Sequence, residues 1–168
     1  RNVFSGLNHG PNLNGNNLVF DIARGSDASS DLLASISFSG DGGILKQGNG
    51  ILSLSGANDY TGATAVNAGT LVVNGSTSAA SAVTVASGAT LGGSGSIGGA
   101  ITVQSNATLA PGSAVGKWTA GASVNIAGRL AIEIDGAAND SIAVAGQLNI
   151  SGATLGLNVL VGGTGQNE

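Results

Sequence analysis

A short motif, a small residue followed by Thr-Leu, recurs along this chain at an interval of roughly 20 residues, which is within the range of solenoid repeats. The copies are Gly69-Thr70-Leu71, Ala89-Thr90-Leu91, Ala107-Thr108-Leu109 and Ala153-Thr154-Leu155. The first three are almost evenly spaced. Two apolar pairs also return at nearly the same interval, Val83/Val85 as Ile101/Val103 and Val124/Ile126 as Ile142/Val144. Such repetition predicts a solenoid, in which successive windings of the chain stack on each other.

Within the repeats, hydrophobic and polar residues alternate, which is the period of a β-strand and not of a helix. The alternating runs are short and end at Gly, Asn or Ser, as strands between tight turns do. The best helical candidate, from Asp27 to Ala34, has no flanking support. We therefore predict an all-β fold, a single-stranded right-handed parallel β-helix (β-solenoid) with about 18–20 residues and about three short strands per coil. At roughly 20 residues per coil, the chain would form about eight coils and a rod on the order of 40 Å long.

The composition agrees with stacked coils and excludes several functions. Charged residues make up 8% of the chain, against about a quarter in an ordinary soluble domain, because rows of like charge on neighbouring coils would repel. With a formal charge of −4 and five Lys and Arg, the chain lacks the basic surface that nucleic acid or anionic lipid needs. It has no cysteine, which excludes disulfides and thiolate metal sites. The interval 103–124, with Pro111 and Lys117-Trp118, breaks the period and is predicted to bulge outward as a loop.

The stretch from Leu45 to Leu71 reads LKQGNGILSLSGANDYTGATAVNAGTL. It closely resembles the passenger-associated transport repeat of autotransporters, which use type V secretion. The resemblance rests on its Leu-Lys-x-Gly-x-Gly opening, its Leu-x-Leu-x-Gly-x-Asn, its Tyr-x-Gly-x-Thr-x-Val and its Gly-Thr-Leu. Residues 88–99, 107–112 and 140–155 look like the following and closing coils. We therefore expect preceding coils and an N-terminal loop in residues 1–40, repeat coils in 41–160 and a truncated C-terminal end in 161–168.

The resemblance implies a right-handed β-helix near the C-terminal end of a passenger, in a protein secreted or displayed at the surface of a Gram-negative bacterium. There it would template folding outside the outer membrane, promote secretion and serve as a stalk. Its expected partners are its own upstream passenger and a downstream outer-membrane barrel. No catalytic residue, cofactor, nucleotide or metal is expected. The alternative is an adhesin or self-association module that binds host glycans or like copies through exposed Ser, Thr and Asn rows; an enzymatic passenger is a third possibility.

The ends of the chain carry their own expectations. Because the sequence begins at Arg1 without Met and stops in a Gly-rich stretch, we expect it to be part of a longer protein. An uncapped terminal coil presents unpaired strand edges. The chain is therefore expected to stack end to end unless residues 1–16 and 161–168 cover those edges.

Few residues offer chemistry, and each has a structural interpretation. Gly93 to Gly98 fits the dinucleotide pattern GxGxxG, but strands and not a helix follow, which predicts a solenoid corner; the same stretch lacks the Asp of a calcium repeat. His9 is predicted to be a solvated loop residue. Among acids, Glu133, Asp135 and Asp140 lie close in sequence, as do Asp27 and Asp31, and glycan hydrolases use such pairs. Alternation places Glu133 outward, as a solvated residue.

The remaining singular residues are predicted to be structural. Tyr60 is expected to cover the apolar seam at a coil corner, and Trp118 to close a side of the rod beneath the long loop, each with its polar atom in water. Lys46 is predicted to be an outward cation near Asp41 or Asp59, in a pair worth little. The acceptor-like triplets beginning at Asn74, Asn106 and Asn149 are expected to be unmodified.

Overall fold

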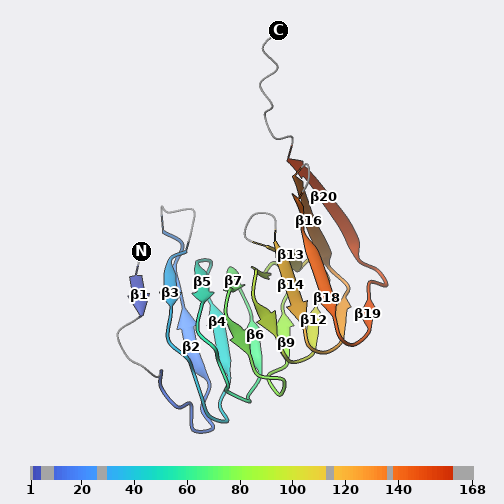
Figure 1. The fold of residues 1–168 in the computed structure, drawn as a ribbon. Coiled ribbons are helices and arrows are strands. Elements are labelled where there is room, and N and C mark those ends of the chain that lie inside the picture. Colours follow the sequence, from blue (N-terminus) through green and yellow to red (C-terminus); the bar gives the residue numbers. More distant parts are fainter. Residues whose placement is uncertain (1, 5–9, 26–29, 113–115, 136–137, 161–168) are drawn as a thin grey trace.

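The computed structural model describes residues 2–4, 10–25, 30–112, 116–135 and 138–160, and all elements within these ranges are strands joined by turns and loops. The strands form a parallel β-solenoid of about six turns, whose coils follow one another along a single axis (Figure 1). The prediction of an all-β solenoid is confirmed. In this part of the chain no helix is long and apolar enough to cross a membrane.

Three sheets run along the solenoid. The first contains β1 (Asn2–Phe4), β3 (Leu32–Ala34), β5 (Ile51–Leu54), β7 (Thr70–Val73), β10 (Thr90–Gly93), β13 (Thr108–Pro111), β16 (Arg129–Asp135) and β20 (Thr154–Leu160), with the short β17 (Ala138–Asn139) antiparallel to the end of β16. The second contains β2 (Leu18–Asp21), β4 (Ile44–Gln47), β6 (Thr64–Val66), β9 (Val83–Val85), β12 (Ile101–Val103), β15 (Val124–Ile126) and β19 (Leu148–Asn149). The third contains β8 (Ser76–Thr77), β11 (Ser96–Ile97), β14 (Lys117–Ala120) and β18 (Ser141–Val144).

The repeated Thr-Leu motif forms a column inside the first sheet. Leu71, Leu91 and Leu109 are direct register partners, and all three side chains are buried. The number of residues between successive copies of the motif is therefore the length of one turn of the solenoid, as predicted. The fourth copy is not next in the column, however, because Arg129-Leu130 intervenes and Leu155 pairs with Leu130. Apolar burial along this column, at roughly 25 cal/mol per Å², is the main source of cohesion between coils.

The coils at the two ends are longer than the sequence period suggests, and the solenoid has about six turns where eight were predicted. In the first sheet Asn2 pairs with Leu32, and Arg129 pairs with Thr154. Both steps take up more of the chain than the step from Leu71 to Leu91. In the step from Arg129 to Thr154 the extra residues include those of the seven-residue β16 and of β17. A uniform coil length therefore describes only the middle of the chain.

One predicted repeat is wrong. Val83 and Val85 do pair with Ile101 and Val103, but Val124 pairs with Leu148 and not with Ile142. Ile142 and Val144 lie in β18 of the third sheet, opposite Trp118 and Ala120. Because β16 has seven residues and β17 follows it, the chain reaches the third sheet late, and distance in sequence no longer gives position in the coil.

The predicted outward loop over 103–124 is also wrong. Most of this interval is built into the solenoid as the end of β12 and as β13 and β14, and Trp118 in β14 is fully buried. β13 ends at Pro111, which cannot donate a further ladder hydrogen bond. Residues 113–115, between β13 and β14, lie outside the described part of the chain. The irregular spacing therefore reflects a longer connection between the first and third sheets within one coil.

Two corner positions show why the turns need particular residues. Gly93 has φ +116°, and a Cβ there would lie 2.1 Å from the carbonyl oxygen of Val73 in the coil before it. Only glycine fits both the dihedral and the contact. Asn106, which precedes Ala107-Thr108, has φ +63°, a left-handed conformation that Asn tolerates better than most residues.

Candidate functional site

Lys46 is buried inside the solenoid and does not point outward as predicted. Its side chain is 0% exposed, and its Nζ donates to the carbonyl oxygens of Gln47 at 2.7 Å, Gly48 at 2.7 Å and Ala68 at 3.1 Å. The ammonium thus joins the turn after β4 to the turn of the next coil. Burial lowers the pKa of Lys46 below its ordinary value of 10.5, and the charges of Asp21 and Asp31 oppose part of this shift. The alternation of the sequence could have predicted this burial, because Ile44 and Lys46 lie on the same inward face of β4.

Asn58 holds three successive coils together with its side-chain amide. Its Oδ1 accepts a hydrogen bond from the backbone N–H of Phe38 at 3.0 Å. Its Nδ2 donates to the carbonyl oxygens of Gly56 and Ser76, both at 3.0 Å. The side chain is 4% exposed, so it satisfies backbone groups that water cannot reach.

Tyr60 lies at the next corner and is fully buried, so the prediction that its hydroxyl is wet is wrong. The hydroxyl lies 2.6 Å from Thr64 Oγ1, which in turn lies 3.2 Å from Ser81 Oγ. Burial raises the pKa of the Tyr60 phenol above its ordinary value of 10.0, while the hydrogen bonds to Thr64 and Ser81 oppose the shift. This dry chain of hydroxyls links two coils and presents no group to a ligand.

Trp118 is likewise inside and not at the edge of the rod. Its ring is fully buried in β14, and its Nε1 finds no hydrogen-bond partner among the described residues. Trp118 is a core residue, so the predicted place at a side of the rod and the expected contact of the indole nitrogen with water are both wrong. An unpaired indole N–H costs free energy, which the large apolar area of the ring offsets.

Asp31 ties the first coils together and is not free for catalysis. Its carboxylate accepts hydrogen bonds from Ile51 N at 2.7 Å and Gly25 N at 2.8 Å, and Arg24 Nη1 lies 3.0 Å from it. The two backbone donors and then Arg24 lower the pKa of Asp31 below its ordinary value of 3.8, although burial opposes them. Its predicted neighbour Asp27 lies outside the described residues, as does His9.

Glu133 and Asp140 lie close together, but the carboxylate of Asp140 is already hydrogen-bonded to backbone N–H groups. Asp140 is buried, and its carboxylate accepts hydrogen bonds from Gly116 N and Glu133 N, both at 2.8 Å. Glu133 is half-buried, on the outer face of β16. The side chain of Asp135 lies outside what the structure describes. Asp140 therefore braces the start of β14 against β16, and each of its carboxylate oxygens already accepts a backbone hydrogen bond.

The Gly93–Gly98 stretch is a solenoid corner, as predicted, because β10 ends there and the short strand β11 follows. Asn74 lies beneath it, and its Oδ1 accepts a hydrogen bond from Ser94 N at 3.1 Å. A helix N-terminus, which a dinucleotide phosphate would need, does not follow this corner. The polar groups of the corner therefore join coils.

Residues 44–73 match the family model described as passenger-associated-transport-repeat. The match spans β4 to β7 and includes Lys46, Asn58, Tyr60 and Thr64, the side chains that cross-link neighbouring coils. No match was found among curated proteins. The matched repeat, together with the parallel solenoid around it, fits the β-helix of an autotransporter passenger.

Proposed function

We propose that this chain is a non-catalytic passenger segment that templates the folding of neighbouring coils, promotes secretion across the outer membrane and then serves as a surface stalk. It would act at the surface of a Gram-negative bacterium. Its partners would be the upstream passenger and a downstream outer-membrane barrel. The family match and the solenoid fold support this assignment.

One observation carries the proposal: each coil is buried by the next coil in register. The leucine column runs through the first sheet, and the second sheet adds a column of Val83, Ile101 and Val124. A new coil therefore gains apolar burial, about 25 cal/mol per Å², as soon as it lies on a formed one. Because contacts join adjacent coils, folding can propagate from a formed segment without an external energy source.

Residues 44–73 would be the first segment to fold, because their side chains form hydrogen bonds between coils. Lys46, Asn58 and Tyr60 each take part in hydrogen bonds that connect adjacent coils. These bonds add directional contacts to the apolar burial. A formed template of this kind would make backward movement of the exported chain unfavourable.

The test is surface display in a Gram-negative host, with the chain placed upstream of an autotransporter barrel. Replacing Leu71, Leu91 or Leu109 by Asp should block display, because a carboxylate inside the column stops the stacking of coils. The control is Leu155→Asp, whose side chain is 61% exposed and which should be displayed normally. Normal export of the three inward variants, with the same variants unfolded in vitro, would refute the templating role.

A further inference from the structure

The outer face of the first sheet carries a column of threonines that is interrupted once. Register places Thr70, Thr90 and Thr108 over one another, and the column ends with Arg129 and Thr154. Arg129 is therefore the one charged member among hydroxyl side chains. It is exposed, at the beginning of β16.

Small residues form a second column beside the threonines. Gly92 pairs with Ala110, and Ala131 pairs with Gly156. The pairing of Leu109 with Leu130 brings Ala110 beside Ala131. Without long side chains, this column forms the floor of a depression that runs across the strands, along the axis of the solenoid.

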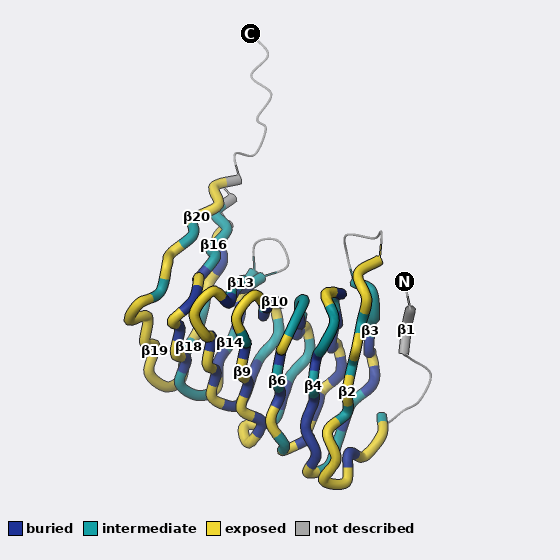
Figure 2. The backbone as a smooth tube through the Cα atoms, turned by 180° about the vertical axis from the view of Figure 1, so that it is seen from behind, coloured by how far each residue is buried: buried dark blue, intermediate teal, exposed yellow. Residues whose placement is uncertain are grey.

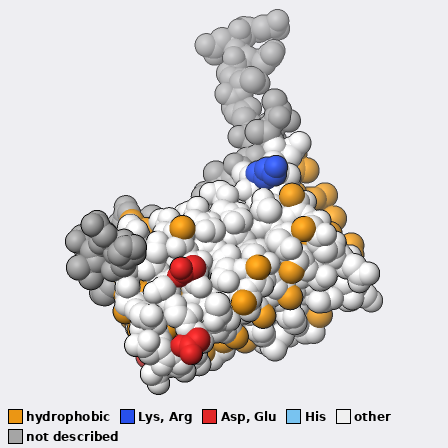
Figure 3. Space-filling view, turned by 60° about the horizontal axis from the view of Figure 1, so that its bottom comes forward, with side chains coloured by type: hydrophobic (Ala, Val, Ile, Leu, Met, Phe, Trp, Pro, Cys, Tyr) orange, Lys and Arg blue, Asp and Glu red, His pale blue; other side chains and the backbone are white. Residues whose placement is uncertain are grey.

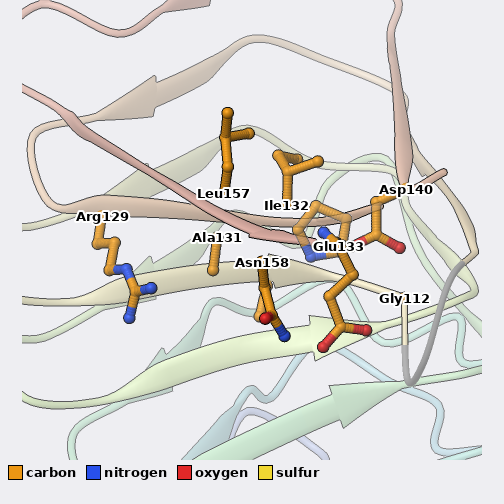
Figure 4. A pocket seen from close by; sticks show the side chains of 10 residues that line it. Gly112, Arg129, Ala131, Ile132, Glu133, Asp140, Leu157 and Asn158 are labelled. Atoms are coloured by element: carbon orange, nitrogen blue, oxygen red, sulfur yellow. Dashed lines mark hydrogen bonds between the residues drawn. The ribbon is translucent and has the colours of Figure 1, made fainter. Parts of the chain in front are cut away.

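Two adjoining hollows of about 430 and 520 Å³ lie on this face, and Arg129 lines both. The first is bordered by Glu133 and Asn158, the second by Thr108 and Thr154. In Figure 4 the side chains of Arg129, Glu133 and Asn158 point to the same side of the strands, whereas Ile132 and Leu157 point to the other. We call these two hollows, which share Arg129, the Arg129 groove.

The guanidinium of Arg129 lies along the groove floor, in the space that a glycine leaves open. A Cβ at Gly156 would lie 2.4 Å from Arg129 Nε and 2.5 Å from Nη2. The guanidinium therefore lies directly over Gly156, on the side toward Asn158. Within the described residues it has no hydrogen-bond acceptor or carboxylate partner, in contrast to Arg24, which pairs with Asp31.

We propose that the Arg129 groove binds an acidic oligosaccharide, with a uronate carboxylate on Arg129. A guanidinium is suited to grip a carboxylate with two parallel hydrogen bonds. The amide of Asn158, the carboxylate of Glu133 and the hydroxyls of Thr108 and Thr154 have the donors and acceptors that sugar hydroxyls need. This role would be additional to templating and gives the adhesin alternative a defined site.

An acidic peptide fits the groove less well. Peptides commonly gain affinity by adding a strand to a sheet edge, and among the described strands at the groove only β20 offers such an edge, because β10, β13 and β16 are already paired on both sides. A highly charged polyanion is disfavoured as well, since a single cation lines the described part of the groove and such ligands need several.

The experiment is a calorimetric titration of the whole chain with a uronate oligosaccharide, its neutral counterpart and oligoglutamate. Binding of the uronate is expected, with about tenfold or greater loss of affinity in Arg129→Gln, as expected for a charged hydrogen bond. Gly156→Val should weaken it too, by displacing the guanidinium. The matched control is Lys117→Gln, which removes an exposed cation on β14, outside the groove, and should bind as the wild type does.

Three outcomes would overturn the proposal: no uronate binding, equal binding by Arg129→Gln with its fold verified by circular dichroism, or equally tight binding of oligoglutamate. The first would leave no ligand of this class. The second would place any binding elsewhere. The third would show a general response to anions or a peptide site.

Discussion

Two leucines in the same column of this solenoid have opposite surroundings. Leu91 in β10 and Leu155 in β20 each follow Ala-Thr and point inward, yet Leu91 is 0% exposed and Leu155 is 61% exposed. The difference is that β10 has a rung on both sides, whereas β20 pairs only with β16 among the described strands. Burial here is produced by the following coil and not by the motif.

The same contrast extends to the whole last coil. Large exposed apolar residues gather there, namely Leu148, Ile150, Leu155, Leu157 and Val159. In Figure 2 the middle rungs have buried residues along their inner side, while β19 and β20 are largely exposed. The surface elsewhere carries few charges, as the face in Figure 3 shows. The last coil therefore has the composition of a core and the accessibility of a surface.

The largest difference between the two regions is expected from removing the leucines. Leu91→Ala should lower the free energy of unfolding by about 2–5 kcal/mol, because it leaves a cavity in a closed column. Leu155→Ala should change it by less than about 1 kcal/mol, since little burial is lost. Urea unfolding followed by circular dichroism measures both. Equal losses would show that the last coil is covered in solution.

A glycine pair gives the next largest contrast. Gly93→Ala should cost about 2–4 kcal/mol, because the new Cβ would meet Val73 O and the positive φ is strained. Gly152 also has a positive φ, +82°, but a Cβ there would meet nothing within 4 Å. Gly152→Ala should therefore cost only the dihedral strain, about 1 kcal/mol. Thermal unfolding of the two variants distinguishes contact from strain, and identical shifts would contradict this account.

The third comparison is between a buried lysine, Lys46, and an exposed one, Lys117. Lys46→Met should destabilise the chain by about 1–3 kcal/mol, because the carbonyls of Gln47, Gly48 and Ala68 lose a buried donor. Lys117→Met, at an exposed position, should be neutral within about 0.5 kcal/mol. Denaturant unfolding at neutral pH is the measurement. A neutral or stabilising Lys46→Met would show that burying the ammonium costs more than its bonds return.

The smallest effect concerns acid. Because the pKa of Asp31 is lowered in the folded state, its contribution to stability is present above its ordinary value of 3.8 and is lost as pH falls through the folded pKa. The urea concentration at the midpoint of unfolding should therefore decrease in the wild type as the pH is lowered below about 4. Asp31→Asn should show a weaker fall, whereas Asp59→Asn, at an exposed position, should leave the fall unchanged. Equal acid sensitivity in all three proteins would show that Asp31 does not contribute to the loss of stability in acid.

The local pattern predicted most rungs of this fold. Alternation and the Thr-Leu recurrence located Leu71, Leu91 and Leu109, and the motif from Leu45 to Leu71 pointed to the correct repeat family. The predicted register was wrong at Ile142 and Val144, because the long β16 and the added β17 precede the third sheet in that coil. Arg129-Leu130 is a copy of the Thr-Leu motif with its Thr replaced, and this substitution was the available signal for the Arg129 groove.

What the sequence determined by itself is the repeating unit, because strand alternation and glycine corners depend on neighbours a few residues away. What only the tertiary structure decided is the surroundings of single side chains. Lys46 is charged and lies inside, since carbonyls of two turns converge on its Nζ. Leu155 is apolar and lies exposed, since no rung follows it among the described residues. Both depend on groups supplied by other coils, which no local pattern records.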